Sequence, residues 1–521
     1  MLNALIWDGL LNEGYYTHGA SFGDFPFHMN IISSFVYGCN KNRKHLFDLV
    51  SPFYAHKELA YPFIPNYYSS VLISCYGVSI HDATVFPSIP VSIALYIILV
   101  DLIFEFTKSE FAAIIGVYLF TYNGGMGFTH FFYEKYRQSW FIDYVHYWDD
   151  DWKEFWLQAV SHVLLPQRAS LFSMPIAWSV ILILMRCNER GSATEFIAAG
   201  LLVALLPQIH PHSIIALAQW GVVFALITFP YKKVEKMPRF IMRYMCLGIT
   251  AIVFGAFQCI PLIGRSTQND FMKIQPINRG EFEKDIITLW CRGLGPFIVM
   301  ALIHSPLILN KTQWKFYIPS IVVFLLGNII YYQPWALDNT KVFYAAFIPL
   351  ATASVSLFMK KLTKFGFLGV VTFIVLFMFS IFSGILSVYV TWKTRSIEWD
   401  IYAASYNSAN FIINNTPPDS IWISDNQHQN PIVTLAGRQI FVGYIGWLMN
   451  HGLDFESRQE IMNRLVDNPE DTTEIDEFNI TYVGVRYSDP EYPFYPPDNS
   501  TKWSHIYSSV AFDIWQRTSE K

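Results

Sequence analysis

The stretch FGFLGVVTFIVLFMFSIFSGILSVYVT, residues 365–391, contains no charged residue and is long enough to cross a lipid bilayer as one helix. A hydrocarbon core about 30 Å thick requires about 20 apolar residues in an α-helix. The 521-residue chain shares this character, because 53% of its residues are hydrophobic and only 15% are charged. We therefore predict a polytopic membrane protein rather than a soluble one.

Similar apolar runs recur along most of the chain. An additional stretch from Phe63, FIPNYYSSVLISCYGVSI, has Pro, Asn and Tyr near its start, and we interpret it as an interfacial helix. We expect about ten transmembrane helices, each an apolar run of roughly spanning length, at residues 86–105, 110–122, 170–185, 195–207, 213–229, 240–263, 287–309, 316–332, 342–358 and 365–391.

The chain after Trp392 has a different pattern. SIWISD, ITYVGVRY and VAFDIWQR are typical of strands, and DFESRQEIMNRLV is typical of an amphipathic helix started by Asp454 with Glu456 in its first turn. We therefore predict an all-α polytopic membrane domain followed by a small α/β domain. The expected parts are an extracytoplasmic first loop with interfacial helices (1–85), a transmembrane domain (86–392) and a soluble extracytoplasmic domain (393–521).

The distribution of basic residues predicts the orientation. The connections on one side hold 13 Lys and Arg in 39 residues, whereas those on the other side hold 9 in 85. The positive-inside rule makes the first side cytoplasmic, so the N-terminal loop and the tail are expected on the lumenal or extracytoplasmic side. Asn-x-Ser/Thr sequons at Asn414, Asn479 and Asn499 lie in that tail and favour the endoplasmic reticulum over the plasma membrane. The sequon at Asn310 falls on the cytoplasmic side and is expected to be silent.

Composition excludes several classes of partner and site. The formal net charge of −5 and the lack of a broad basic face exclude nucleic acid as a partner. The six cysteines are scattered and include no CxxC pair, so neither a disulfide framework nor a zinc site is indicated. The N-terminal sequence MLNALIWDGLLNEGYY lacks the basic segment of a cleaved signal peptide.

One polar pair stands out near the start, in SFGDFPFHM. Asp24 and His28 are four residues apart, so in a helix they would face the same side. A carboxylate beside an imidazole suits general-base chemistry. The alternative is that Asp24 is a helix N-cap, with Pro26 in the first turn.

Other ionisable residues occur where the predicted spans meet the outer side. His210 and His212 in PQIHPH are either interfacial hydrogen-bonding histidines or metal ligands, which leaves a divalent metal open without indicating one. Arg168 lies at one such span end, and Asp338 and Lys341 lie at another. Arg and Lys at these positions either snorkel to lipid headgroups or bind a lipid-linked phosphate. The run Asp149, Asp150 and Asp151 lies between aromatic residues and favours an interfacial belt over a metal site.

Several stretches together resemble one known family. They are SFGDFPFHMNIISSFVYG, LAYPFIPNYYSSVL, NGGMGF, LLPQRASLF, LLPQIHPHS, WALDNTKVF and LAGRQIFVGYIGWLMNHGLDFESR. They are similar to a largely uncharacterised family of multi-pass membrane proteins, common in prokaryotes and assigned to the GT-C glycosyltransferase superfamily. Relatives begin with a spanning helix before the acidic loop, whereas this sequence begins inside that loop.

The resemblance implies a membrane glycosyltransferase that takes a sugar from a polyprenyl (dolichyl)-phosphate carrier. It matches Asp24 to the catalytic acid of the first extracytoplasmic loop and His28 to the polar residue paired with it. It also implies that donor contacts come from Arg168, His210, His212, Asp338 and Lys341. Membrane lipid and the lipid-linked donor are the expected partners, and protein partners are unknown. The alternatives are a transporter or lipid-handling protein, or a catalytically inactive GT-C-like scaffold.

Overall fold

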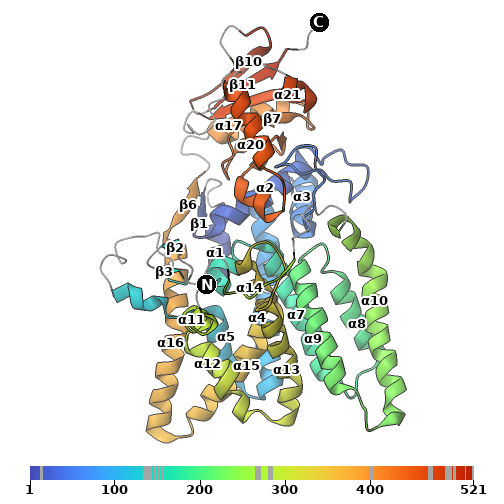
Figure 1. Cartoon of the computed structure of the whole chain (residues 1–521), viewed down its shortest axis with the longest axis vertical. Helices are drawn as coiled ribbons and strands as arrows, with labels where there is room; N and C mark the ends of the chain where they lie inside the picture. The colour runs from blue at the N-terminus through green and yellow to red at the C-terminus, as the bar shows by residue number, and fades with distance from the viewer. Residues whose placement is uncertain are drawn as a thin grey trace. The chain divides into compact units, whose positions relative to one another are not determined.

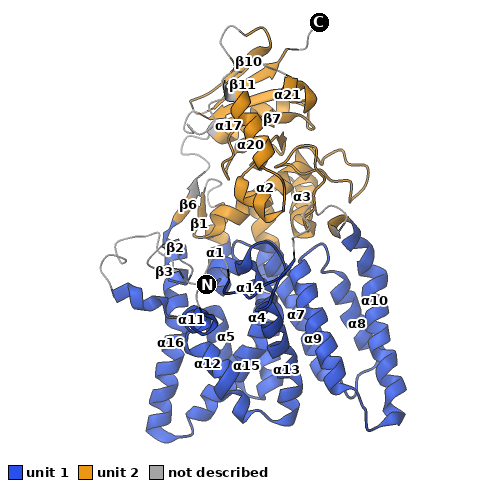
Figure 2. Cartoon of the chain, viewed as in Figure 1, with its two compact units in different colours: residues 1–6, 88–260, 269–394 blue, residues 7–87, 261–268, 395–521 orange. Residues whose placement is uncertain are grey.

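The computed structural model describes residues 1–11, 16–132, 144–145, 148–149, 152–153, 156–263, 272–279, 285–398, 404–467, 473–486, 496, 500–510 and 512–518. These residues form two compact units, coloured separately in Figure 2. Unit 1 contains residues 1–6, 88–260 and 269–394, and unit 2 contains residues 7–87, 261–268 and 395–521. The first loop and the tail, which the sequence suggested as separate parts, therefore belong to one unit.

Each of the ten predicted apolar runs contains helix in the structure (Figure 1). The corresponding helices are α4 (Ile80–Thr107), α5 (Glu110–Thr121), α7 (Arg168–Cys187), α8 (Ala193–Ala204), α9 (Pro211–Thr228), α10 (Met237–Ile263), α11 (Ile286–Leu294) with α12 (Pro296–Val299), α13 (Lys311–Gly327), α14 (Asn339–Val342) with α15 (Ile348–Leu362), and α16 (Gly366–Lys393).

Fewer helices are long enough to cross a membrane alone than the ten expected. Within the described residues, six are long and apolar enough, or seven if the bent pair at 286–294 and 296–308 counts as one span. That pair bends by 113° because Gly295 takes a left-handed φ of +58° and Pro296 has no N–H to continue the helix. Helices α5 and α8 are apolar but have only 12 residues each. The count of about ten spans stays a prediction.

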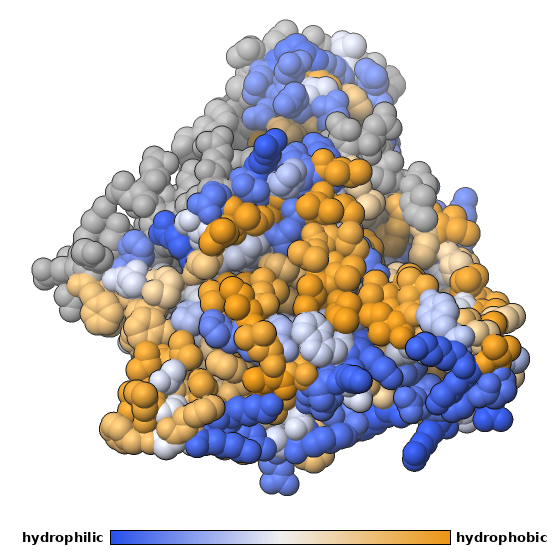
Figure 3. All heavy atoms as spheres, turned by 60° about the horizontal axis from the view of Figure 1, so that its bottom comes forward, coloured by the Kyte–Doolittle hydropathy of each residue, from blue (hydrophilic) through white to orange (hydrophobic). Residues whose placement is uncertain are grey.

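The spanning helices of unit 1 differ in how much protein covers them. In the segment of residues 336–362, 94% of the apolar window is buried inside the protein, whereas in α10 only 6% is buried. The first value identifies a central helix, and the second identifies a helix whose apolar side chains face outward, as lipid contact requires. Figure 3 shows hydrophobic residues spread across the middle of the view and hydrophilic residues along its lower edge.

Unit 2 contains a five-stranded mixed sheet, in the order β10 (Trp503–Ser508), β11 (Phe512–Arg517), β9 (Tyr482–Arg486), β7 (Ile421–Ile423) and β8 (Gln439–Ile440). The three predicted strands are confirmed as β7 (Ile421–Ile423), β9 (Tyr482–Arg486) and β11 (Phe512–Arg517), and the predicted amphipathic helix is α20 (Glu456–Asp467). Strand β7 pairs in parallel with β8 (Gln439–Ile440) and β9, whereas β11 is antiparallel to β9 and to β10 (Trp503–Ser508). The strands and the helix that were expected in the tail are thus present, within unit 2.

The first loop packs on the tail through helix α2 (Ser21–Val36), which contacts α3 (Ile64–Tyr76) and α18 (Pro431–Thr434). At 13 residues α3 is too short to cross a bilayer, in line with the interfacial interpretation. The chain after α2 approaches the tail so closely that a Cβ on Gly38 would lie 1.7 Å from the carbonyl oxygen of Gly437. Gly437 itself has a φ of +67°, so both positions require glycine. Strand β1 (Tyr16–His18) also pairs with β6 (Arg395–Glu398).

Candidate functional site

Asp24 and His28 both lie on α2, but Asp24 is not its N-cap. The helix begins at Ser21, its N-cap is Ala20, and no side chain caps it. The N-cap alternative is therefore wrong: the helix starts three residues earlier than the pattern suggested and accommodates Pro26 inside it. Asp24 instead lies half-buried in the first turn of the helix.

His28 is held by a neighbour from α3. Its side chain is 3% exposed, and Nδ1 lies 3.1 Å from Nδ2 of Asn66. An amide nitrogen can only donate, so Nδ1 of His28 accepts this hydrogen bond. Sequence reasoning missed Asn66, because a single asparagine in an aromatic stretch gives no signal of its partner.

The surroundings of α2 come from the tail. Trp447 Nε1 donates to the carbonyl oxygen of Gly23 at 3.0 Å. The ring of Phe27 lies 4.7 Å from that of Tyr61 and 5.2 Å from that of His451, measured between centroids. These contacts fix the turn that carries Asp24 and His28. Those made by Trp447 and His451 join segments more than 400 residues apart in sequence.

In unit 1, the two predicted histidines lie together where α9 begins. The ring centroids of His210 and His212 are 5.1 Å apart. His210 Nδ1 lies 2.9 Å from Ser213 Oγ and 3.1 Å from Ser173 Oγ, and the two hydroxyls are 3.0 Å apart. This closed set of hydrogen bonds joins α7 to α9 and fixes the His210 ring. Neither serine was predicted, since hydroxyls are common in apolar helices.

Asp338 and Lys341 form an ion pair of 2.8 Å, with side chains 8% and 16% exposed. They lie on the segment 336–341, whose helix α14 packs on α9. Burial first, and then the charges of His212 and Lys341, hold the pKa of His210 well below its usual value of 6.5. His210 is therefore neutral, and the positive charge of Lys341 contributes to keeping it so. The structure thus brings His210, His212, Asp338 and Lys341 into one cluster.

Arg168 is the first residue of α7 and is 1% exposed. Its guanidinium carbon lies 5.7 Å from the centroid of the Phe172 ring. The snorkelling alternative is wrong for this residue, because the protein itself encloses the side chain. Arg168 and the cluster above belong to unit 1, whereas Asp24 and His28 belong to unit 2. The catalytic and binding roles of all these residues stay predictions.

No group of three or more His, Cys, Asp or Glu side chains is placed to hold a metal ion among the residues that the structure describes. Asp149 belongs to β2 (Trp148–Asp149), and Asp150 and Asp151 lie outside the described residues. A metal requirement therefore stays open.

The sequons differ in how their asparagines are engaged. Asn414 is exposed on α17 (Ala404–Asn415) and donates to the carbonyl oxygen of Asn410 at 2.9 Å, and Asn479 is exposed in a turn with a φ of +50°. Asn310 caps α13 by accepting from the N–H groups of Thr312 and Gln313. Asn499 lies outside the described residues.

The comparisons with known proteins rest on structure. No family model matches the sequence, and no curated protein matches it either. Among solved structures, the chain is similar to the oligosaccharyltransferase of Archaeoglobus fulgidus in the apo form, with a TM-score of 0.58 and 9% identity, over 93% of this chain and 68% of that one. The same archaeal enzyme, AglB, in complex with an inhibitory peptide and a dolichol-phosphate, gives a TM-score of 0.55 at 11% identity, over the same shares.

A second solved structure matches over nearly the full length of both chains. It is ArnT from Cupriavidus metallidurans bound to undecaprenyl phosphate, with a TM-score of 0.54 and 9% identity, over 99% of this chain and 97% of that one. Identities this low show the fold alone. The chain has a fold like that of the GT-C glycosyltransferases AglB and ArnT.

Proposed function

We propose that this protein is a membrane glycosyltransferase of GT-C type. It transfers a sugar from a polyprenyl (dolichyl)-phosphate-linked donor to an acceptor on the lumenal or extracytoplasmic side. The likeness to AglB and ArnT supports the class of enzyme, since both have been solved with a polyprenyl-type phosphate bound. The tail sequons favour the endoplasmic reticulum as its membrane.

The observation that carries the proposal is the cluster of His210, His212, Asp338 and Lys341. An ammonium group donates three hydrogen bonds, so the ion pair with Asp338 leaves Lys341 two for a phosphate. Neutral His210, fixed by Ser173, adds a hydrogen-bonding imidazole without repelling the cation. Arg168 is the second cation of unit 1 assigned to the donor phosphate, because guanidinium groups bind phosphate bidentately.

Asp24 is the proposed general base. The acceptor hydroxyl attacks the anomeric carbon, the bond from that carbon to the phosphate oxygen breaks, and its electron pair leaves with the lipid phosphate. The proton of the hydroxyl passes to the Asp24 carboxylate, and the cations of unit 1 stabilise the departing phosphate. One displacement of this kind inverts the anomeric carbon. His28, one turn further along the same helix, helps Asp24 to orient the acceptor.

The test uses full-length protein in liposomes with a polyprenyl-phosphate-linked hexose and follows release of the lipid phosphate. Wild type is expected to turn over, and Asp24→Asn is expected to lower turnover about 10²- to 10⁴-fold, the usual contribution of a general base. Asp48→Asn, at an exposed carboxylate of the same unit, is the matched control and should retain activity. Normal turnover by folded Asp24→Asn protein would remove the assignment. Lipid flux without sugar transfer would support the transporter alternative, and loss of lipid-phosphate binding would support the scaffold.

A further inference from the structure

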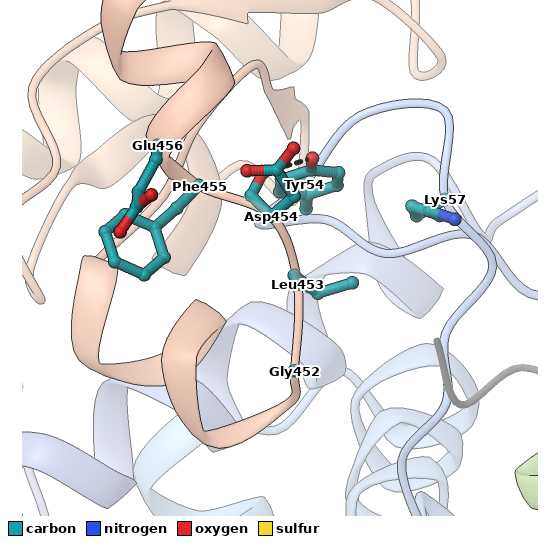
Figure 4. Close-up of a pocket in the computed structure, with 7 residues that line it drawn as sticks. All are labelled: Tyr54, Lys57, Gly452, Leu453, Asp454, Phe455 and Glu456. Carbon is teal, nitrogen blue, oxygen red and sulfur yellow. Dashed lines mark hydrogen bonds between the residues drawn. The ribbon is translucent and has the colours of Figure 1, made fainter. Parts of the chain in front are cut away.

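A pocket of about 400 Å³ opens within unit 2 (Figure 4). One wall is the loop that carries Tyr54 and Lys57, and the other is the connection into α20, residues 452–456. Cavities of roughly 300–1,000 Å³ are the usual size of small-molecule sites. In Figure 4, Glu456 and Phe455 lie on one side of the pocket and Lys57 lies on the other, with Asp454 and Tyr54 between them.

The walls of this pocket are joined by buried contacts. Tyr54 donates its hydroxyl to the carbonyl oxygen of Asp454 at 2.6 Å. The guanidinium carbon of Arg458, a residue 7% exposed, lies 3.5 Å from the centroid of the Tyr54 ring, and Nη2 donates to the carbonyl oxygen of Ala55 at 2.7 Å. The Tyr54 loop is closed by the N–H of Ser51, which donates to the carbonyl oxygen of Lys57 at 2.7 Å. The pocket is therefore preorganised.

Two carboxylates and one ammonium group line the pocket. Hydrogen bonds from the side chain and N–H of Ser457 lower the pKa of Asp454, which keeps its carboxylate ionised. Asp454 Oδ1 accepts from the Ser457 N–H at 3.3 Å, which leaves further acceptor capacity on the same group. The lining side chains carry two negative charges, on Asp454 and Glu456, and one positive charge, on Lys57. The Arg458 guanidinium is covered by the Tyr54 ring, so the pocket offers a phosphate no pair of cations. Lys57 would repel a cationic ligand. The mixture of charges therefore favours a neutral ligand that has both hydrogen-bond donors and acceptors.

We propose that this pocket binds a saccharide. Hydroxyl groups donate to the carboxylates of Asp454 and Glu456, and hydroxyl or ring oxygens accept from Lys57. The half-buried side chains of Phe455 and Leu453 supply the apolar surface against which the C–H faces of a sugar pack. This inference rests on the proposed function for its role, in which the bound saccharide is part of the acceptor.

The test measures binding to full-length protein in nanodiscs by saturation-transfer NMR. The probes are methyl α-D-mannopyranoside, methyl α-D-glucopyranoside and N-acetylglucosamine, together with glucosamine and inorganic phosphate. At least one neutral glycoside is expected to bind, and phosphate is expected not to bind. The double variant Asp454→Asn, Glu456→Gln should weaken that binding at least tenfold, and Asn still offers an oxygen to cap α20. Glu477→Gln, at an exposed carboxylate of unit 2, is the matched control and should bind as wild type.

Three outcomes would overturn the assignment. They are the absence of neutral glycoside binding, equal binding by wild type and the double variant, and binding of protonated glucosamine alone. Hydrolysis of the donor in the absence of an acceptor, followed as release of lipid phosphate, tests the proposed function separately from saccharide binding. If the wild type binds glycosides but never cleaves the donor, the proposed function fails and the pocket stands. If donor cleavage persists in every variant but no glycoside binds, the proposed function stands and the saccharide assignment of the pocket fails.

Discussion

Trp447 Nε1 donates a 3.0 Å hydrogen bond to the carbonyl oxygen of Gly23, the residue before Asp24. The two residues are 424 positions apart, and both belong to unit 2. The tail therefore holds in place the helical turn that presents the proposed base. A catalytic group gains from such support, because its geometry must be fixed before the substrate arrives.

The first prediction concerns the donor. Lys341→Gln should raise the KM for the lipid-linked sugar about 10- to 100-fold, since a hydrogen bond to a charged group is worth about 1.5–3 kcal/mol. Steady-state kinetics in liposomes measure the change. Lys360→Gln, in the last turn of α15, is the matched control and should leave KM unchanged. An unaltered KM in folded Lys341→Gln protein would show that Lys341 does not bind the donor.

The second prediction concerns the distance between Asp24 and Lys341, the proposed base and the proposed phosphate-binding cation. The proposed mechanism requires the base and the phosphate cation to act on the same anomeric carbon, so it predicts that Asp24 and Lys341 come close together during turnover. Cysteines at these two positions, in a chain whose six native cysteines are replaced, should be joined by a short bis-maleimide. The pair of cysteines at 24 and 360 should not be joined. Equal crosslinking of both pairs, or of neither, would contradict the shared centre.

The third prediction concerns stability. Arg438 is fully buried and donates to the carbonyl oxygens of Tyr37 at 2.6 Å and Thr416 at 3.0 Å. Arg438→Met leaves these acceptors without their donor, at a cost of about 1–3 kcal/mol for each buried group. Limited proteolysis should therefore release the tail at lower denaturant than in wild type. Arg464→Met, at a side chain 58% exposed, should change stability by less than about 1 kcal/mol.

The fourth prediction concerns pH. Burial lowers the pKa of His428 from its ordinary 6.5 to about 4, and its ring lies 3.6 Å from that of Tyr444 between centroids. Between these pH values the unfolded chain binds a proton that the folded chain does not, so stability is full above pH 6.5 and falls as pH drops toward 4. Denaturation midpoints across this window should fall for wild type and fall less for His428→Gln. Parallel curves for the two proteins would rule out His428 as the source.

The fifth prediction concerns glycosylation. Asn479 is exposed, whereas the Asn310 side chain is engaged in the cap of α13 and is expected on the cytoplasmic side. Expression in a eukaryotic cell should yield a glycan at Asn479 that Asn479→Gln removes, seen as a mobility shift. Asn310→Gln should cause no shift. A glycan on Asn310 would show that the chain lies in the membrane with the opposite orientation to the one predicted.

The sequence alone determined the helical membrane domain and most of the tail. Apolar runs such as residues 365–391 define helices because the bilayer requires every backbone group to be hydrogen-bonded within its own segment. The same local reasoning found β7, β9, β11 and α20, whose alternating or helical patterns lie within one stretch. It also found His210, His212, Asp338 and Lys341, since topology alone gathers the ends of spans on one side.

Only the tertiary structure decided the contacts between distant segments. Helix α2 begins at Ser21, so Asp24 is not its N-cap, and the first loop and the tail belong to one unit. The tertiary structure also paired Asp338 with Lys341, fixed His210 with Ser173, and closed the pocket of Tyr54 and Asp454. Sequence patterns report the period of a single helix or strand, whereas partners far apart in sequence are chosen by packing and by the cost of leaving buried polar groups unpaired.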